Sequence, residues 1–328
     1  MTKLTSLAPR LPWRSWILAV LPAILATGLG GPGSLSAQAI CSAPHSSPTL
    51  AQSGSLQTLP QFGGWIQASV FGSRSTEFFG ADGNRQSFLG DSKFLTRSMF
   101  LSGAVGVVDG VELWTQIPLH HLSVESAGGD SESFGLGDIR IAARVGSELF
   151  GWDVPLALRM GTKVPGSDFP VDATVLPLTE GQRDWELSVE SAYRSRLRAL
   201  YIMGWAGYRW REANEKAARD PGDELFGHLA VGGSLGNLSL ELAADALWGK
   251  APVAQGFILE GNGRRLIQIQ PTVGWGVGPG RLEATAQIPV WGKHLPVGNG
   301  ISLGYRLTWG LEPDEPESLL DILGEEKR

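Results

Sequence analysis

Cysteine is almost absent from this chain of 328 residues, and its single Cys41 excludes both a disulfide framework and a cysteine metal cluster. The five histidines are scattered without the spacing of metal ligands, so the sequence predicts no metal and no cofactor. Charged residues make up only 18 % of the chain, and the formal net charge is −6. A nucleic-acid partner, which needs a basic surface, is therefore not expected.

Long apolar runs are missing as well, apart from one near the N-terminus. Residues 16–29 are apolar but interrupted by Pro22; they follow three basic residues and precede the cleavage-site pattern Ala37-Gln38-Ala39. This order predicts a secretory signal peptide over residues 1–39 and favours it over an uncleaved membrane anchor, for which the run is short. No later stretch has the length of a transmembrane helix, so a membrane location requires strands. Whether Cys41 carries a lipid stays open.

Residues 301–311 alternate apolar and polar side chains with a period of two, which predicts a strand. In a soluble sheet the apolar face is buried, whereas a membrane barrel turns it toward lipid around a polar lumen. We expect Leu307 to face lipid near the bilayer midplane. The stretch is also similar to the signal that closes outer-membrane barrels and is read by their assembly machinery, through Ser302, Gly304, Leu307 and Trp309.

Similar segments recur along the chain and are joined alternately by tight turns and long polar loops, which is typical of a membrane barrel. An even strand number places both termini on the periplasmic side, where export leaves them. The predicted fold is therefore an all-β, antiparallel transmembrane β-barrel of about 12 strands with a short C-terminal helical tail in the cell outer membrane. The segments are 64–74, 94–107, 111–123, 134–147, 152–163, 184–194, 198–210, 224–236, 238–248, 264–276, 281–291 and 300–311.

Three regions flank or form the predicted barrel. Residues 40–62, rich in Ser, Pro and Gln, are expected to be a flexible periplasmic leader that can fold into the barrel mouth. Residues 63–311 are the barrel, and residues 312–328 are an acidic periplasmic tail with the apolar stripe of a short helix.

Tryptophans gather at the ends of the predicted strands, which is where indole rings meet a membrane interface. This pattern predicts one girdle at each rim of the barrel. Its members are Trp65, Trp152, Trp275 and Trp309 at the periplasmic rim, and Trp185, Trp210, Trp248 and Trp291 at the outer rim.

Inward-facing charges are the candidate functional residues, because charges inside a barrel set the field that a permeating molecule meets. The alternative is that they pair across the lumen and only stiffen it, and the sequence leaves both open. Strand order places Glu283 beside Arg306 on the last hairpin. The lumen candidates are Glu112, Asp138, Arg140, Arg144, Arg159, Lys163, Glu186, Glu190, Arg209, Glu241, Asp245, Glu283 and Arg306.

Three stretches carry a family resemblance. Residues 134–146 contain a Gly-x-Gly-Asp strand, residues 161–187 combine a Lys-x-Pro strand exit with a Gly-Gln-x-Asp return, and residues 287–292 hold Pro289, Trp291 and Gly292. In order and spacing they resemble the outer-membrane barrel family named after the meta-pathway of phenol degradation. The resemblance implies a channel or transporter for passive uptake or efflux of small molecules, including hydrophobic or aromatic ones.

Two other classes of function stay open: an outer-membrane barrel with a structural, adhesive or lipid-enzyme role, and a soluble periplasmic binding barrel. An enzyme is not expected, because the adjacent His120 and His121 point to opposite faces and His228 lacks a nearby nucleophile pattern. The expected partners are outer-membrane lipid, the barrel-assembly machinery and a small permeant, with the oligomeric state open. The loops 164–183 and 249–263 are where a constriction or ligand contact is expected.

Overall fold

The computed structural model describes residues 58–311, except 128, 153, 171, 173, 174 and 196–199. The predicted signal peptide 1–39, Cys41 and the tail 312–328 with its predicted helix lie outside the described residues. In the described part, no helix is long and apolar enough to cross a membrane. The helical segments there are two short 3-10 turns, η1 (Leu89–Asp91) and η2 (Ser147–Phe150).

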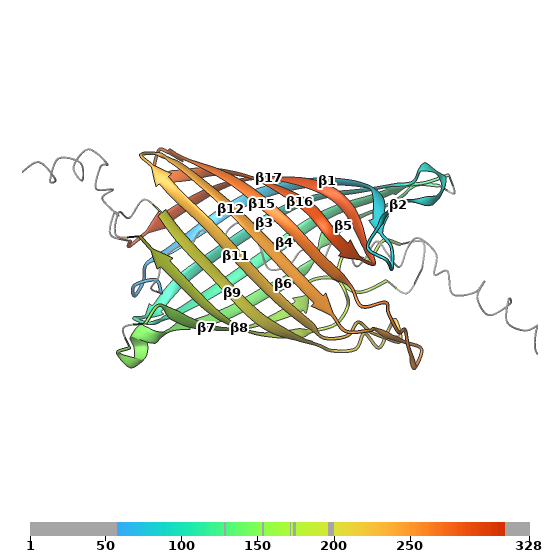
Figure 1. Cartoon of the computed structure of the whole chain (residues 1–328), viewed down its shortest axis with the longest axis horizontal. Coiled ribbons are helices and arrows are strands. Elements are labelled where there is room, and N and C mark those ends of the chain that lie inside the picture. Colours follow the sequence, from blue (N-terminus) through green and yellow to red (C-terminus); the bar gives the residue numbers. More distant parts are fainter. Residues whose placement is uncertain are drawn as a thin grey trace, which may run out of the picture.

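Twelve antiparallel strands form a closed barrel, and they run inclined to its axis (Figure 1). Each predicted segment corresponds to one of them, so the predicted fold class and strand number are confirmed. The strands are β1 (Gly64–Phe79), β3 (Lys93–Val108), β4 (Val111–Glu125), β6 (Asp138–Gly146), β7 (Leu156–Pro165), β8 (Asp184–Arg194), β9 (Leu200–Arg211), β11 (Glu224–Leu235), β12 (Leu238–Gly249), β15 (Arg265–Val277), β16 (Gly280–Lys293) and β17 (Leu295–Trp309).

Five shorter strands lie at the edges or in the loops. β2 (Arg85–Ser87) pairs with β1, and β5 (Ser131–Leu136) extends the wall beside β4. β10 (Arg219–Asp220), β13 (Val253–Ala254) and β14 (Phe257–Ile258) form a small separate sheet. This small sheet connects two of the long loops, because β10 and β13 belong to different connections.

The two ends of the barrel differ in how the strands are joined. Residues 109–110, 236–237 and 278–279 form tight turns at one end, which we call the short-turn end. Residues 166–183, 212–223 and 250–264 connect strands at the opposite end, which we call the long-loop end. This alternation is the one that the sequence predicts, and it is typical of outer-membrane barrels.

The last strand closes the ring by pairing with the first. Gly64 of β1 lies opposite Trp309 of β17, and Phe79 lies opposite Leu295 at the other end of the pair. The Trp309 Nε1–H also donates a hydrogen bond of 2.9 Å to the carbonyl oxygen of Phe62. Closure leaves neither strand with an unpaired edge along this seam, which removes a template for aggregation.

Apolar side chains cover the outer face and polar side chains the inner face. On β12, Leu240 and Leu242 are 54 % and 53 % exposed, whereas Glu241 and Asp245 between and after them are buried. This arrangement is the inverse of a soluble core and is the one that a lipid-facing barrel requires. Leu307 also faces outward, but it lies opposite Gly280 at a tight turn rather than near the midplane.

Most of the predicted girdle tryptophans point outward near the strand ends. Trp152, Trp185, Trp210, Trp248, Trp275 and Trp309 are between 40 % and 64 % exposed. Trp291 is half-buried, and its ring lies close to Gly83 in the loop after β1.

The assignment of Trp65 to the predicted girdle is wrong, because its side chain is buried inside the barrel. It shares its face of β1 with the buried Gln67 and Ser69, whereas its neighbour Ile66 is exposed. The guanidinium carbon of Arg306 lies 5.2 Å from the centre of its ring. Trp65 therefore packs under a lumen charge and does not contact lipid.

Residues 58–62 lie against the short-turn end. The Thr58 backbone N–H and hydroxyl each donate to Glu148 Oε1 at 2.6 Å, and the Leu59 N–H donates to Glu112 Oε2 at 2.9 Å. Leu59 is buried among the inner apolar side chains. Residues 58–62 therefore lie at the barrel mouth, and residues 40–57 of the predicted leader lie outside the described residues.

Candidate functional site in the barrel lumen

All the predicted lumen charges lie on the inner side of the barrel. Arg140, Arg159 and Glu186 are half-buried, and the others are buried. They do not form one continuous group but gather into several ion-paired clusters. Their role in permeation stays a prediction, whereas their pairing is a feature of the structure.

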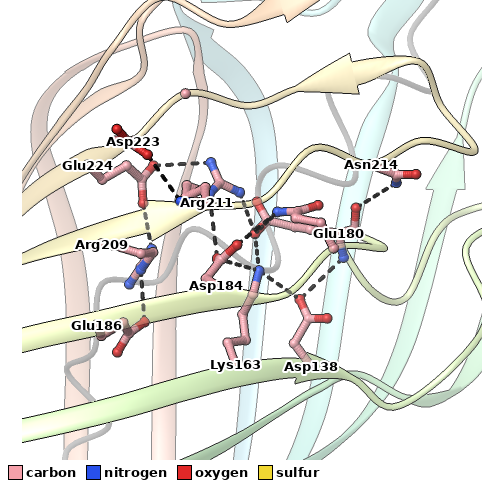
Figure 2. A network of polar contacts seen from close by, with 12 residues as sticks. Asp138, Lys163, Glu180, Asp184, Glu186, Arg209, Arg211, Asn214, Asp223 and Glu224 are labelled. Carbon is pink, nitrogen blue, oxygen red and sulfur yellow. Dashed lines mark hydrogen bonds and ion pairs between the residues drawn. The ribbon is translucent and has the colours of Figure 1, made fainter.

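The densest cluster lies at the long-loop end, and we call its seven residues the mouth cluster: Asp138, Lys163, Glu180, Asp184, Arg211, Glu224 and Arg264. Figure 2 labels all of them except Arg264. Lys163 lies at the centre of the cluster, fully buried, with its Nζ 2.8 Å from Asp184 Oδ2 and 3.4 Å from Asp138 Oδ2. A third carboxylate, that of Glu180, also accepts a hydrogen bond from this ammonium group.

Glu180 differs from the other members because it comes from the loop 166–183 and not from a barrel strand. Its carboxylate lies 2.5 Å from Arg211 Nη2 and 3.0 Å from Arg264 Nη1. Burial alone would raise the pKa of Glu180, but Arg211, Lys163 and Arg264 together hold that pKa well below its ordinary value. Glu180 is therefore an ionised loop carboxylate enclosed by three cations.

The Glu180 backbone is also fixed by side chains. Its N–H donates to Asp138 Oδ2 at 3.2 Å, and the Asn214 side-chain amide donates to its carbonyl oxygen at 2.8 Å. Asn214 lies in a different long loop, the one after β9. The mouth cluster therefore joins two loops to the wall of the barrel.

Arg209 continues the mouth cluster toward the middle of the lumen. Its Nη1 donates to Glu224 Oε2 at 2.5 Å, and its Nε donates to Glu186 Oε1 at 2.8 Å (Figure 2). Arg140 Nη1 lies 3.5 Å from the same Glu186 oxygen. Glu186 thus accepts from two guanidinium groups on strands that are not adjacent.

A second bridge of this kind lies nearer the short-turn end. Glu190 Oε2 accepts a hydrogen bond of 2.8 Å from Arg144 Nε, and Glu190 also forms an ion pair with Arg159. Arg144 lies directly opposite Arg159 in the β6–β7 ladder, so the carboxylate compensates two adjacent positive charges. Arg144 Nη1 lies 3.4 Å from Glu112, the residue that holds Leu59.

The opposite wall carries the predicted pair of the last hairpin. Arg306 Nη2 lies 3.3 Å from Glu283 Oε2, which confirms that the two side chains are neighbours. Arg306 Nε also donates to Gln67 Oε1 of β1 at 3.1 Å. The hydroxyl of Tyr201 donates to Glu241 Oε2 at 2.5 Å on the same side of the lumen.

Asp245 forms the centre of a further group. Its Oδ1 lies 2.6 Å from His228 Nδ1, and its Oδ2 accepts hydrogen bonds from the side-chain amides of Gln268 at 3.1 Å and Gln270 at 2.5 Å. The His228 ring stacks on Trp205, with ring centres 3.8 Å apart. Sequence reasoning found no partner for His228, because Asp245 reaches it from the neighbouring strand.

The inner face is not uniformly polar. A patch of buried apolar residues extends from Leu59 at the short-turn end through Trp65, Trp114 and Trp205 to Phe226. A small cavity lies between these rings and the charges, lined by residues that include Trp114, Arg159, Glu186 and Phe226. The lumen therefore offers an apolar surface beside its ion pairs.

Sequence reasoning missed several members of the mouth cluster. Asp184 and Arg211 lie on the inner face two positions from the predicted Glu186 and Arg209, and Glu224 lies on the inner face at the start of β11. Alternation alone would have found all three. Arg264 directly precedes β15. Glu180 and Asn214 lie in loops, where no period indicates the direction of a side chain.

Comparison with known proteins places this barrel among characterised folds. The family model described as "Putative MetA-pathway of phenol degradation" matches residues 69–305. No curated protein sequence matches the chain. The COG4313 outer membrane channel from Pseudomonas putida F1 is similar over 78 % of this chain and 98 % of its own, with 16 % sequence identity and a TM-score of 0.65. That similarity supports the barrel fold.

Two further solved barrels are more distant. The KdgM porin matches 73 % of this chain and 98 % of its own, with 7 % identity and a TM-score of 0.40. The CymD monoaromatic hydrocarbon channel matches 77 % of this chain and 90 % of its own, with 7 % identity and a TM-score of 0.39.

Proposed function

This chain belongs to the "Putative MetA-pathway of phenol degradation" family, and we propose that it is a passive outer-membrane channel for small molecules. The closed barrel with an apolar outer face and a charged lumen is an outer-membrane fold. The observation that carries the proposal is the polar lining itself. Ion-paired side chains line the lumen from the mouth cluster at the long-loop end to Glu112 near the short-turn end.

The lining fits small solutes of more than one kind. Because most lumen charges are paired, a permeant meets alternating local fields rather than one strong field of a single sign. The apolar patch around Trp114 and Phe226 gives hydrophobic or aromatic solutes a surface to contact. Passive passage along such a lining can run in either direction, as uptake or as efflux.

The lumen is narrow. Lys163, Asp184 and Arg209 are inside the barrel and yet fully buried, so neighbouring side chains fill the space around them. A ring of twelve strands lies between small barrels that are filled by side chains and large porins that hold an open channel. We therefore expect a low conductance that depends on how the lumen side chains pack.

Single-channel conductance of the refolded chain in a planar bilayer tests this function, with heat-modifiable migration on a gel as the check of folding. The Trp114→Ala variant removes a large lumen side chain and should raise the conductance. Leu113→Ala is the matched control, because Leu113 is the neighbour of Trp114 in sequence, but its side chain faces outward and is 47 % exposed. A folded wild type and a folded Trp114→Ala variant that both pass no current would contradict the proposal.

The enzyme alternative has one contact in its favour. Ser98 Oγ lies 2.7 Å from His120 Nδ1, and both side chains are buried on the inner face of neighbouring strands. Among the described residues no carboxylate forms a hydrogen bond or ion pair with His120 that would orient it as a general base. We therefore propose that the chain is not an enzyme. We also propose that its partners are outer-membrane lipid, the assembly machinery and the permeant.

A further inference from the structure

We propose that the mouth cluster is a binding site for the carboxylate group of a permeating molecule, and that Glu180 occupies this site when no such molecule is bound. The inference rests on the proposed channel function and names a class of permeant. It follows from the origin of Glu180, the charge balance around it and the unused donors beside it.

Glu180 is attached in a way that allows it to be replaced. Lys163 and Arg211 belong to barrel strands, and Arg264 directly precedes one, whereas Glu180 lies in the loop 166–183. Its backbone contacts with Asp138 and Asn214 are made by side chains and not by a strand ladder. Moving Glu180 therefore breaks no strand pairing.

The cations of the site keep carboxylate partners on the wall without Glu180. Its three cations, Lys163, Arg211 and Arg264, face three other carboxylates on the barrel strands, those of Asp138, Asp184 and Glu224. Each cation keeps at least one of these partners when Glu180 leaves. Glu180 is thus the additional anion, and a carboxylate from solution can take its place without leaving a buried charge unpaired.

The side chains that contact Glu180 favour an anion at this position. Lys163, Arg211 and Arg264 all form ion pairs with its single carboxylate. A neutral or cationic molecule gains nothing at this position, whereas an anion does.

The guanidinium groups also retain donors that Glu180 does not satisfy. Arg264 Nη2 is buried and finds no hydrogen-bond acceptor among the described residues, and Arg211 Nε lies 3.5 Å from Asp184 Oδ2 without forming a hydrogen bond to it. Buried donors without an acceptor are costly, and guanidinium groups prefer two parallel hydrogen bonds to one carboxylate. A free carboxylate can orient to accept these bonds, whereas the Glu180 carboxylate is constrained by its own backbone.

The test uses the refolded barrel, whose folding is checked by heat-modifiable migration on a gel. Sodium butyrate is the probe, and 1-butanol and butylammonium chloride are its neutral and cationic analogues. Binding is measured by calorimetry in detergent, and reduction of current is measured in planar bilayers. Glu180→Gln removes the competing carboxylate and should increase butyrate affinity about tenfold, because the open site is then fully populated. Both analogues should have no effect.

Two variants complete the test. Arg211→Gln in the Glu180→Gln background should abolish butyrate binding, and Arg264→Gln serves the same purpose if the first variant does not fold. Asp168→Asn is the matched control, because it removes a carboxylate of the same loop 166–183 whose side chain is 97 % exposed, and it should leave butyrate affinity unchanged.

The outcomes separate this inference from the proposed channel. Current that butyrate does not alter, with no heat of binding in either wild type or Glu180→Gln, would overturn the binding site and leave the channel intact. Butyrate binding by a barrel that passes no current would support the site and contradict the channel. Equal binding of butyrate and butanol would also overturn the inference, since the site would not recognise charge.

Discussion

Arg306 Nη2 lies 3.3 Å from Glu283 Oε2, and both side chains are buried on the inner face of the barrel. The same guanidinium group donates to Gln67 on β1, which lies 239 positions earlier in the chain. β17 is therefore joined to both of its neighbours through one lumen side chain, in addition to the backbone ladders. The polar lining contributes to closing the barrel as well as to its interior.

Reversing the charge at this position tests that contribution. Arg306→Glu places a carboxylate beside Glu283 and leaves the buried Glu283 without its cation, which we expect to destabilise the barrel by about 3–5 kcal/mol. The measurement is unfolding in urea in lipid vesicles, followed on a gel by heat-modifiable migration. Adding Glu283→Arg to the same chain should restore most of the loss. A double variant no more stable than the single one would show that the pair does not support closure.

A lysine on the outer face of β17 should cost more in the middle of the strand than at its end. Leu303 is outward, half-exposed and opposite Val70 of β1, so Leu303→Lys should oppose insertion by about 2–4 kcal/mol. Leu307 lies opposite Gly280 at a tight turn, so Leu307→Lys should cost only about 0–1 kcal/mol. The fraction of chain inserted into vesicles measures both. Equal costs would mean that the two positions lie at the same membrane depth.

The anchor of residues 58–62 should depend on Glu148. Burial alone raises the pKa of Glu148, but the hydrogen bonds from Thr58 lower it overall. Their stabilisation is therefore complete above the ordinary value of 4.5 and is lost as the pH falls through the lowered value. Glu148→Gln should weaken the anchor by about 1 kcal/mol and speed proteolysis at residues 58–62.

Asp109→Asn provides the control for this prediction. Asp109 Oδ1 accepts from the Gln61 N–H at 3.3 Å in an exposed position, so this change should have little effect on cleavage. Proteolysis at the same rate in wild type and Glu148→Gln would remove Glu148 from the anchor.

Acid should release Glu180 only at a pH well below the ordinary pKa of a glutamate. Because Arg211, Lys163 and Arg264 lower the pKa of Glu180 against the opposing effect of burial, its ion pairs are fully present above pH 4.5. They are lost as the pH falls through the lowered value. The difference in melting temperature between wild type and Glu180→Gln should stay constant from pH 7 to pH 4.5 and shrink below it. A difference that vanishes above pH 5 would contradict the lowered pKa.

Sequence alone predicted the strands because a barrel repeats one physical rule along its length. Each strand alternates inward and outward side chains, and most connections contain Gly, Asn, Asp or Pro in a tight turn or a long polar loop. The main boundary error is the interval 292–299, which separates the predicted strands 281–291 and 300–311. Pro296 and Gly298 indicate a turn there, but β17 begins at Leu295 because it pairs with the end of β1.

The site was predicted in part, and the misses have separate causes. Trp65 was assigned to the lipid interface from its place at a strand end, although its alternation with Ile66 already indicated the inner face. Glu180 could not have been found, since its direction depends on how a loop folds across the lumen. Its three cations come from residues far apart in sequence, and only the closed ring brings them together.

The seam between β1 and β17 also determines when the structure can be completed during biogenesis. Phe62 and Trp309 are hydrogen-bonded although they lie 247 positions apart, so the last contacts form only after almost the whole chain has been delivered. Contacts of such long sequence separation make folding slow. Until then β1 exposes a row of unpaired N–H and C=O groups. A chain truncated before Leu295 would keep two open edges, on β1 and β16, for as long as it exists.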